Sequence, residues 1–194
     1  MEEYCIDMFT TTYRKWMNDY NIKTKNGPNG QYLSIIVAKN EKEKVIKKII
    51  KSNIKYRCYE KRWERSSDYR KEFFEHYQPP YRCRYCNKPL TRSEVFIDHI
   101  IPIGQVKKSS NARMKLYARG ISKVNDIRNL VPSCKSCNER KGMKLGVWSW
   151  KGILGKYKWY WIIRKILFIL FGIIIIYFAY KTFDINTILS IFSH

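Results

Sequence analysis

The chain has 194 residues, of which 38 are Lys or Arg and 16 are Asp or Glu, so its formal net charge is +22. This length suits one domain of modest size with an appendage. Apolar residues make up 45% of the sequence, which excludes a wholly disordered basic tail, because such tails lack the apolar material that offsets the entropy of ordering. The charge indicates a polyanionic partner, either nucleic acid or an anionic membrane surface.

The N-terminal sequence predicts a chain that stays inside the cell, since residues 1–7 are acidic and lack the apolar run of a secretory signal. The cell interior is reducing, so the six cysteines are expected to be metal ligands or free thiols rather than disulfides. Cys5 and Cys58 have no nearby cysteine partner and are interpreted as ordinary thiols.

Residues 1–80 are predicted to form a basic extension of strand and helix. A turn signal over residues 26–30 precedes an apolar strand over 32–37, and apolar residues at helical spacing then predict an amphipathic helix from Asn40. Aromatic residues alternating with Arg and Lys predict a second helix over 56–77, which the prolines after Gln78 end.

Two Cys-x-x-Cys pairs predict a structural zinc site with four cysteine ligands: Cys83, Cys86, Cys134 and Cys137. The 47 residues between Cys86 and Cys134 exceed the spacing of a simple zinc ribbon, so a sizeable insertion is expected. The alternative is a redox dithiol, which needs only one such pair. Because a four-cysteine zinc has no open coordination position, any catalysis must come from other residues.

The segment between and around these pairs resembles the HNH endonuclease family. The resemblance covers residues 82–142 and depends on Asp98-His99-Ile100-x-Pro102, Asn129-Leu130-Val131 and Asn138-x-x-Lys141, in that order with the cysteine pairs. It implies an α+β fold built on a ββα-metal finger, which is a β-hairpin and a helix that hold a catalytic divalent ion.

The resemblance also implies a role for each matching residue. Asp98 would ligate the ion, His99 would be the general base, and Asn129 would brace the hairpin. Asn138 stands where the family often has histidine, which resembles the His-Asn-Asn variant and makes Asn138 the second metal ligand. The implied reaction is hydrolysis of a DNA phosphodiester that leaves a 5′ phosphate and a 3′ hydroxyl.

Elementary chemistry agrees with these roles. Imidazole has a pKa near neutrality and suits a general base. A Lewis acid stabilises the charge that develops on the phosphate and the departing oxygen. The oxygens of Asp98 and Asn138 favour a hard ion, either Mg²⁺ or Mn²⁺. The alternative is that His99 is merely a packed histidine; His76 and His194 are interpreted as a helix-surface residue and part of the C-terminus.

Basic residues are expected to hold the substrate. Lys and Arg are frequent over residues 55–71 and again over 113–128. Such residues neutralise phosphates and release counterions, but they do not read sequence. The alternative is a solvated helix face. The predicted nucleic-acid contacts are Arg62, Arg65, Arg128, Arg140 and Lys141.

The C-terminal part is predicted to anchor the chain in a membrane. Residues 166–180 carry no charge, and residues 162–183 would form a helix of about 33 Å, enough to cross the hydrocarbon core of about 30 Å. From Arg140 to Phe183, counting both ends, there are nine Lys or Arg and no acidic residue, which places the preceding body on the cytoplasmic side. The alternatives are a buried helix or an oligomer contact in a cytoplasmic protein.

The sequence therefore predicts a basic extension (1–80), an HNH nuclease domain (81–146), a basic-aromatic juxtamembrane linker (147–161), a single transmembrane helix (162–183) and a short tail (184–194). The predicted function is a membrane-anchored DNA endonuclease with structural Zn²⁺ and catalytic Mg²⁺ or Mn²⁺. Two alternatives remain open: a catalytically inactive nucleic-acid-binding module tethered to a membrane, and a membrane protein whose basic body contacts only anionic lipid.

Overall fold

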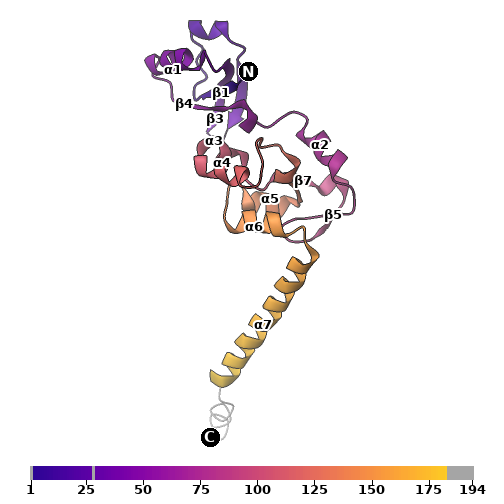
Figure 1. The fold of residues 1–194 in the computed structure, drawn as a ribbon. Coiled ribbons are helices and arrows are strands. Elements are labelled where there is room, and N and C mark those ends of the chain that lie inside the picture. Colours follow the sequence, from indigo (N-terminus) through magenta and orange to yellow (C-terminus); the bar gives the residue numbers. More distant parts are fainter. Residues whose placement is uncertain (1, 28, 183–194) are drawn as a thin grey trace.

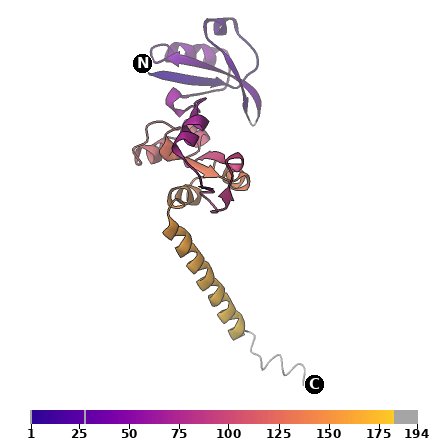
Figure 2. The same ribbon diagram turned by 90° about the vertical axis from the view of Figure 1, so that its right-hand side faces the viewer.

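The computed structural model describes residues 2–27 and 29–182. Its α+β body has an N-terminal sheet at one end, and a single long C-terminal helix projects from the opposite end (Figures 1 and 2). The predicted tail over 184–194, with His194, lies outside the described residues.

Four antiparallel strands form the N-terminal sheet in the order β2-β3-β1-β4. The strands are β1 (Glu3–Met8), β2 (Lys23–Gly27), β3 (Gly30–Ala38) and β4 (Tyr56–Glu60). The predicted strand over 32–37 is confirmed within β3. Strand β1 lies between β3 and β4, so both of its edges are paired, and its residues from Cys5 to Met8 are buried.

Alternation along β1 divides this sheet into two different faces. Ile6 and Met8 face helix α1 (Lys42–Lys51), whose Val45 and Ile49 complete a small apolar core. Helix α1 confirms the helix predicted from Asn40. Cys5 and Asp7 point to the other face, which meets the rest of the body, so the sheet separates an apolar core from a polar interface.

The helix predicted over residues 56–77 is wrong for its first half. Residues 56–60 are strand β4, followed by the 3-10 helix η2 (Lys61–Trp63), and only α2 (Tyr69–His76) is helical as expected. The alternating aromatic and basic residues fit a strand as well as a helix, and pairing with β1 decides between them. The N-terminal extension is therefore richer in strand than the sequence predicts.

The segment that carries the motifs contains two short hairpins. The first pairs β5 (Tyr81–Arg82) with β6 (Pro89–Leu90). The second pairs β7 (Phe96–His99) with β8 (Leu130–Ser133), and helix α5 (Lys135–Lys141) follows β8 directly.

An insertion joins the strands of the second hairpin. Its elements are α3 (Ile103–Lys108), α4 (Ser110–Tyr117) and the 3-10 helix η4 (Ile127–Asn129). A further 3-10 helix, η3 (Arg92–Glu94), precedes β7. The insertion supplies Val106, Leu116 and Ile121 to a core that also contains Trp63 and Phe73. This core therefore crosses the boundary predicted at residue 80.

The predicted linker contains a packed helix, α6 (Val147–Leu154). Trp148 of α6 meets the ring of Tyr85 edge-on at 5.4 Å, and a side chain at Gly152 would touch Ile100. Residues 147–154 thus belong to the body. The prediction of a linker is wrong for these residues, because it overlooked the apolar face with which α6 packs on the body.

Helix α7 (Lys158–Thr182) is long and apolar enough to cross a membrane by length and composition. None of its most apolar stretch is buried in the body (Figure 1). Its described residues include almost all of the predicted span over 162–183, and they exclude the alternative of a helix buried within this chain.

Candidate metal and catalytic site

The thiols of the four paired cysteines lie together, although one pair follows β5 and the other pair lies at the start of α5. Cys83 and Cys86 lie in the turn after β5, where the Cys83 N–H donates to the Lys88 carbonyl at 2.8 Å. Cys134 caps the N-terminus of α5 and Cys137 lies in its first turn. All four Sγ atoms lie within 4.8 Å of one another.

This geometry fits a single tetrahedral zinc. Zn–S bonds of about 2.3 Å place the ligand sulfurs about 3.8 Å apart, and the Sγ atoms of Cys86 and Cys134 are 3.9 Å apart. Burial raises the pKa of the Cys83 thiol, and a bound zinc would offset this by holding the thiolate form. Cys5 and Cys58 are free thiols outside the cluster, as predicted.

Asp98 is buried on β7, with 9% of its surface exposed. Its Oδ2 accepts a hydrogen bond from the Tyr85 hydroxyl and lies 2.9 Å from the Lys141 ammonium. Tyr85 stands between Cys83 and Cys86 in the chain, so the turn that carries the first cysteine pair also holds the Asp98 carboxylate. Lys141 neutralises this carboxylate, so a metal ion at Asp98 would have to compete with the ammonium.

Lys141 differs from its predicted role as a nucleic-acid contact. Its side chain is fully buried, and its Nζ donates to Asp98 Oδ1 at 3.1 Å and to the His99 carbonyl at 2.7 Å. Burial lowers the pKa of Lys141, and Asp98 opposes that effect. Lys141 therefore ties α5 to β7 and is not available to phosphate.

His99, at the end of β7, is also buried, with 3% of its surface exposed. Burial lowers its pKa to about 4; the hydrogen bond with Asn125 opposes this shift, and the charges of Arg65 and Lys141 add to it. The ring of Tyr69, from α2, lies 6.1 Å from the imidazole. At neutral pH the imidazole is therefore neutral, which is the form that can accept a proton.

Asn125 determines which imidazole nitrogen is free. Its Nδ2 donates to the Glu64 carbonyl at 2.7 Å, so its Oδ1 faces His99 Nε2 at 3.2 Å. An amide oxygen only accepts hydrogen bonds, so Nε2 must carry the proton. The lone pair of His99 then lies on Nδ1.

Asn129 is fully buried and holds two loops together. Its Oδ1 accepts from the Ile101 N–H at 2.9 Å, and its Nδ2 donates to the Val124 carbonyl at 2.9 Å. Asn138 is half-buried on α5, three residues before Lys141. Residues three apart share a helix face, so Asn138 lies on the side of α5 that meets β7.

A polar cluster on the second face of the sheet supports the same region. Lys107 Nζ donates to Glu64 Oε2 and to the Tyr59 hydroxyl, both at 2.9 Å. Lys25 lies 3.3 Å from Glu64. Burial opposes ionisation of Glu64, but the bonds from Tyr59 and Lys107 outweigh it and lower its pKa. The N-terminal sheet thereby fixes the residue whose carbonyl orients Asn125.

The predicted phosphate contacts fall into two groups. Arg62 pairs with Glu60, and Arg128 lies 2.6 Å from Asp126. Arg65 and Arg140 are exposed and have no carboxylate partner within the described residues. The Arg65 guanidinium lies 5.1 Å from the ring centre of Tyr69, which itself lies 6.1 Å from the imidazole, and its charge, like that of Lys141, lowers the pKa of His99. Of these two exposed arginines, Arg65 is therefore the one beside His99.

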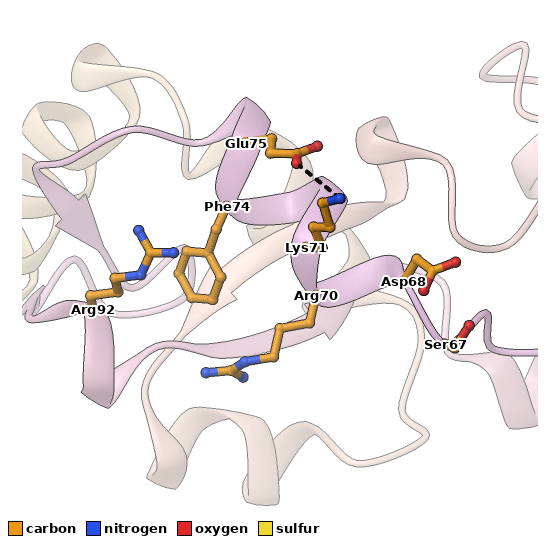
Figure 3. A pocket seen from close by; sticks show the side chains of 7 residues that line it. All are labelled: Ser67, Asp68, Arg70, Lys71, Phe74, Glu75 and Arg92. Atoms are coloured by element: carbon orange, nitrogen blue, oxygen red, sulfur yellow. Dashed lines mark ion pairs between the residues drawn. The ribbon is translucent and has the colours of Figure 1, made fainter.

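A groove of about 1510 Å³ runs between the sheet and the loop before η4, and Asn125, Arg62, Arg65 and Arg128 line it. Its walls mix cations with carboxylates, several of which pair with each other. A second cavity of about 550 Å³ lies beside α2, where the guanidinium groups of Arg70 and Arg92 lie against the Phe74 ring (Figure 3). No predicted site residue lines this second cavity.

The structure brings Asp98, His99 and Lys141 together with two residues that the sequence reasoning missed, Tyr85 and Asn125. Neither residue stands out in the sequence, because each acts through a partner far along the chain. Comparison of the chain with protein-family models, curated proteins and solved structures found no match.

Proposed function

We propose that this protein is a metal-dependent endonuclease of the HNH type that cleaves DNA. The observation that carries the proposal is the succession of β7, β8 and α5, with a buried carboxylate and a neutral, oriented imidazole on consecutive residues of β7. A ββα arrangement of this kind is what the resemblance implies, and the neighbouring four-cysteine cluster would stabilise it with zinc.

In the proposed reaction His99 accepts a proton at Nδ1 from the attacking water, because Asn125 keeps the other nitrogen protonated. The hydroxide attacks the phosphorus atom, the bond from phosphorus to the 3′ oxygen breaks, and the departing oxygen takes a proton from water to become the 3′ hydroxyl, while the phosphate stays on the 5′ side. Positioned bases of this kind contribute about 10²- to 10⁴-fold to a rate. Asn129 would act only by keeping the loops around the imidazole in place.

A catalytic divalent ion would be held by the oxygens of Asp98 and Asn138. Among the described residues Asp98 Oδ1 accepts a hydrogen bond from Lys141 alone, so one of its lone pairs remains for the ion. When bound, Mg²⁺ or Mn²⁺ would stabilise the negative charge of the phosphate and the departing oxygen. Lys141 would then be the ion's competitor for Asp98.

Arg65 and Arg140 are the proposed phosphate contacts, since both are exposed and have no carboxylate partner in the part of the chain that the structure describes. Arg62 and Arg128 would have to exchange Glu60 and Asp126 for phosphate. Binding would therefore depend on salt and not on base sequence.

Helix α7 is the proposed single membrane span, with the nuclease body on the cytoplasmic side. Its length of 25 residues corresponds to about 37 Å, and cations lie at both ends of its apolar stretch. The excess of Lys and Arg in the preceding body favours retention of that body in the cytoplasm.

Nicking of supercoiled plasmid by the full-length protein in detergent tests the proposal. With Mg²⁺ or Mn²⁺ the wild type should relax the plasmid, and His99→Ala should lower the rate by at least about 100-fold. His76→Ala is the matched control, because His76 is exposed on α2. Equal nicking by His99→Ala and the wild type would refute the assigned base.

The burial of His99 and the pairing of Lys141 with Asp98 favour a second candidate, a module that binds nucleic acid without turnover. This candidate predicts a plasmid gel shift that Arg65→Ala and Arg140→Ala weaken, with no nicking in any divalent metal. Nicking that chelation abolishes and Mg²⁺ restores would exclude it.

A further inference from the structure

The junction between the first cysteine pair and the start of the apolar helix contains a cavity of about 740 Å³. Its walls come from the turn after Cys86 on one side and from α7 on the other. Three cations contribute to its lining, namely Lys88, Arg164 and Lys165, and none of its lining residues is acidic. The cavity is therefore positive and lies where the body meets the apolar helix.

The cavity changes in character along α7. Arg164 and Lys165 lie at its polar end, and Phe168 and Phe171 lie one and two turns further along the same helix. With a rise of 1.5 Å per residue, the apolar wall begins at Leu167, about 4.5 Å from Arg164, and extends to Phe171 at about 10 Å. A ligand that fits both ends must join an anionic group to a hydrocarbon chain.

The polar end is preformed. The Trp161 indole N–H donates to the Gly155 carbonyl at 2.9 Å, and the Arg164 guanidinium lies 5.5 Å from the Trp161 ring centre. Lys88 has one acidic neighbour among the described residues, Glu94, at 3.9 Å with both side chains largely exposed. Such an exposed pair is weak and does not neutralise the cavity.

We propose that this cavity binds the headgroup and upper acyl chain of an anionic phospholipid. Lys88, Arg164 and Lys165 hold the phosphate, Trp161 lies at the level of the headgroups, and Phe168 and Phe171 contact the acyl chain. The exposed zinc-site residue Cys86 lines the same cavity, so the lipid fixes the cysteine cluster at the membrane surface. The inference rests on the membrane placement of α7 and not on nuclease activity.

The test is lipid binding by the full-length protein in non-ionic detergent, measured by native mass spectrometry. Wild type should bind phosphatidylglycerol more tightly than phosphatidylcholine. Lys88→Gln and Lys165→Gln should each weaken phosphatidylglycerol binding about fivefold, which is the expected contribution of one cation near a lipid surface. Lys115→Gln, an equal change of charge on the exposed face of α4, should have no effect.

Zinc content is measured on every variant, because Lys88 lies near the cysteine cluster. If Lys88→Gln loses zinc, Arg164→Gln on α7 provides the same test away from the cluster, and it should also weaken binding. Equal affinity for the two lipids, or unchanged phosphatidylglycerol binding by Lys165→Gln and Arg164→Gln, would overturn the proposal. Carbonate extraction tests the placement of α7 separately, so the two failures are distinguishable.

Discussion

The orientation of one amide, that of Asn125, determines the chemistry available at His99. The Glu64 carbonyl occupies the Asn125 Nδ2 donor, which leaves the Asn125 oxygen for His99 Nε2. The proposed base at His99 Nδ1 therefore depends on Asn125, which bonds the imidazole and is itself no proposed metal ligand. Partners of this kind typically alter activity by about 10- to 100-fold.

Asn125→Leu is expected to lower the nicking rate by about 10- to 100-fold, because neither imidazole nitrogen is then held in one protonation state. Asn125→Asp should instead raise the apparent pKa of the pH–rate profile, since a carboxylate stabilises imidazolium. Asn111→Leu makes the same change of side chain on the exposed face of α4 and should leave both readouts unchanged. A rate for Asn125→Leu equal to that of Asn111→Leu would contradict the role of Asn125.

The depressed pKa of His99 also predicts how stability depends on pH. Its pKa is about 4 in the folded chain, against 6.5 for an ordinary histidine. Between these values the unfolded chain binds more protons, so stability is complete above about pH 6.5 and decreases as the pH falls towards 4. Urea unfolding of His99→Gln should show a weaker dependence over this window than the wild type, whereas His76→Gln should match the wild type. An unchanged dependence in His99→Gln would contradict this assignment.

Sequence reasoning located residues that belong to a recognisable motif, and it failed where a contact depends on a distant residue that no motif marks. The cysteine pairs are visible as motifs, and their cluster is as predicted. Lys141, by contrast, has the charge expected of a phosphate contact. Only the fold reveals that it is buried in an ion pair with Asp98. Tyr85 and Asn125 carry no signal of their own.

At the scale of elements the same limit explains the error over residues 56–60. Periodicity alone does not separate a short strand from a helix, and β4 exists because β1, about 50 positions earlier, offers its edge. Strand β3 and helix α1 were predictable because their patterns are local. The packing of α6 on Tyr85 and Ile100 depends on residues far away and was not predictable.

The close approach of Gly155 to the first cysteine pair predicts a strong effect of adding one methyl group. A Cβ at Gly155 would lie 2.1 Å from the Arg84 carbonyl oxygen and 2.7 Å from that of Lys151. Because both neighbours are backbone, Gly155→Ala should destabilise the body by about 1–3 kcal/mol and loosen zinc retention.

Gly172→Ala is the control for that substitution, since a Cβ there meets nothing within 4 Å and alanine favours a helix. Thermal unfolding and zinc content of the detergent-solubilised protein provide the measurement. A Gly155→Ala protein as stable and as zinc-loaded as Gly172→Ala would show that the contact with Arg84 does not constrain the chain.

At the scale of the whole molecule, α7 predicts behaviour during membrane fractionation. The full-length protein should remain in the pellet after carbonate and high-salt washes. The apolar side chains of α7 are not covered by the body, so a bilayer would bury them. A chain that ends at residue 157 should be released by salt. Release of the full-length protein by carbonate would exclude the span.

The short connection between α6 and α7 limits how far the proposed catalytic residues could move from a bilayer that α7 spans. Residues 155–157 separate the two helices, and three extended residues span only about 10 Å. Gly155 also packs against the backbone of Arg84, so this residue of the connection is not free to extend. The proposed nuclease site would thus lie at a nearly fixed distance from the membrane surface. It would cut only those nucleic acids that are brought to the membrane.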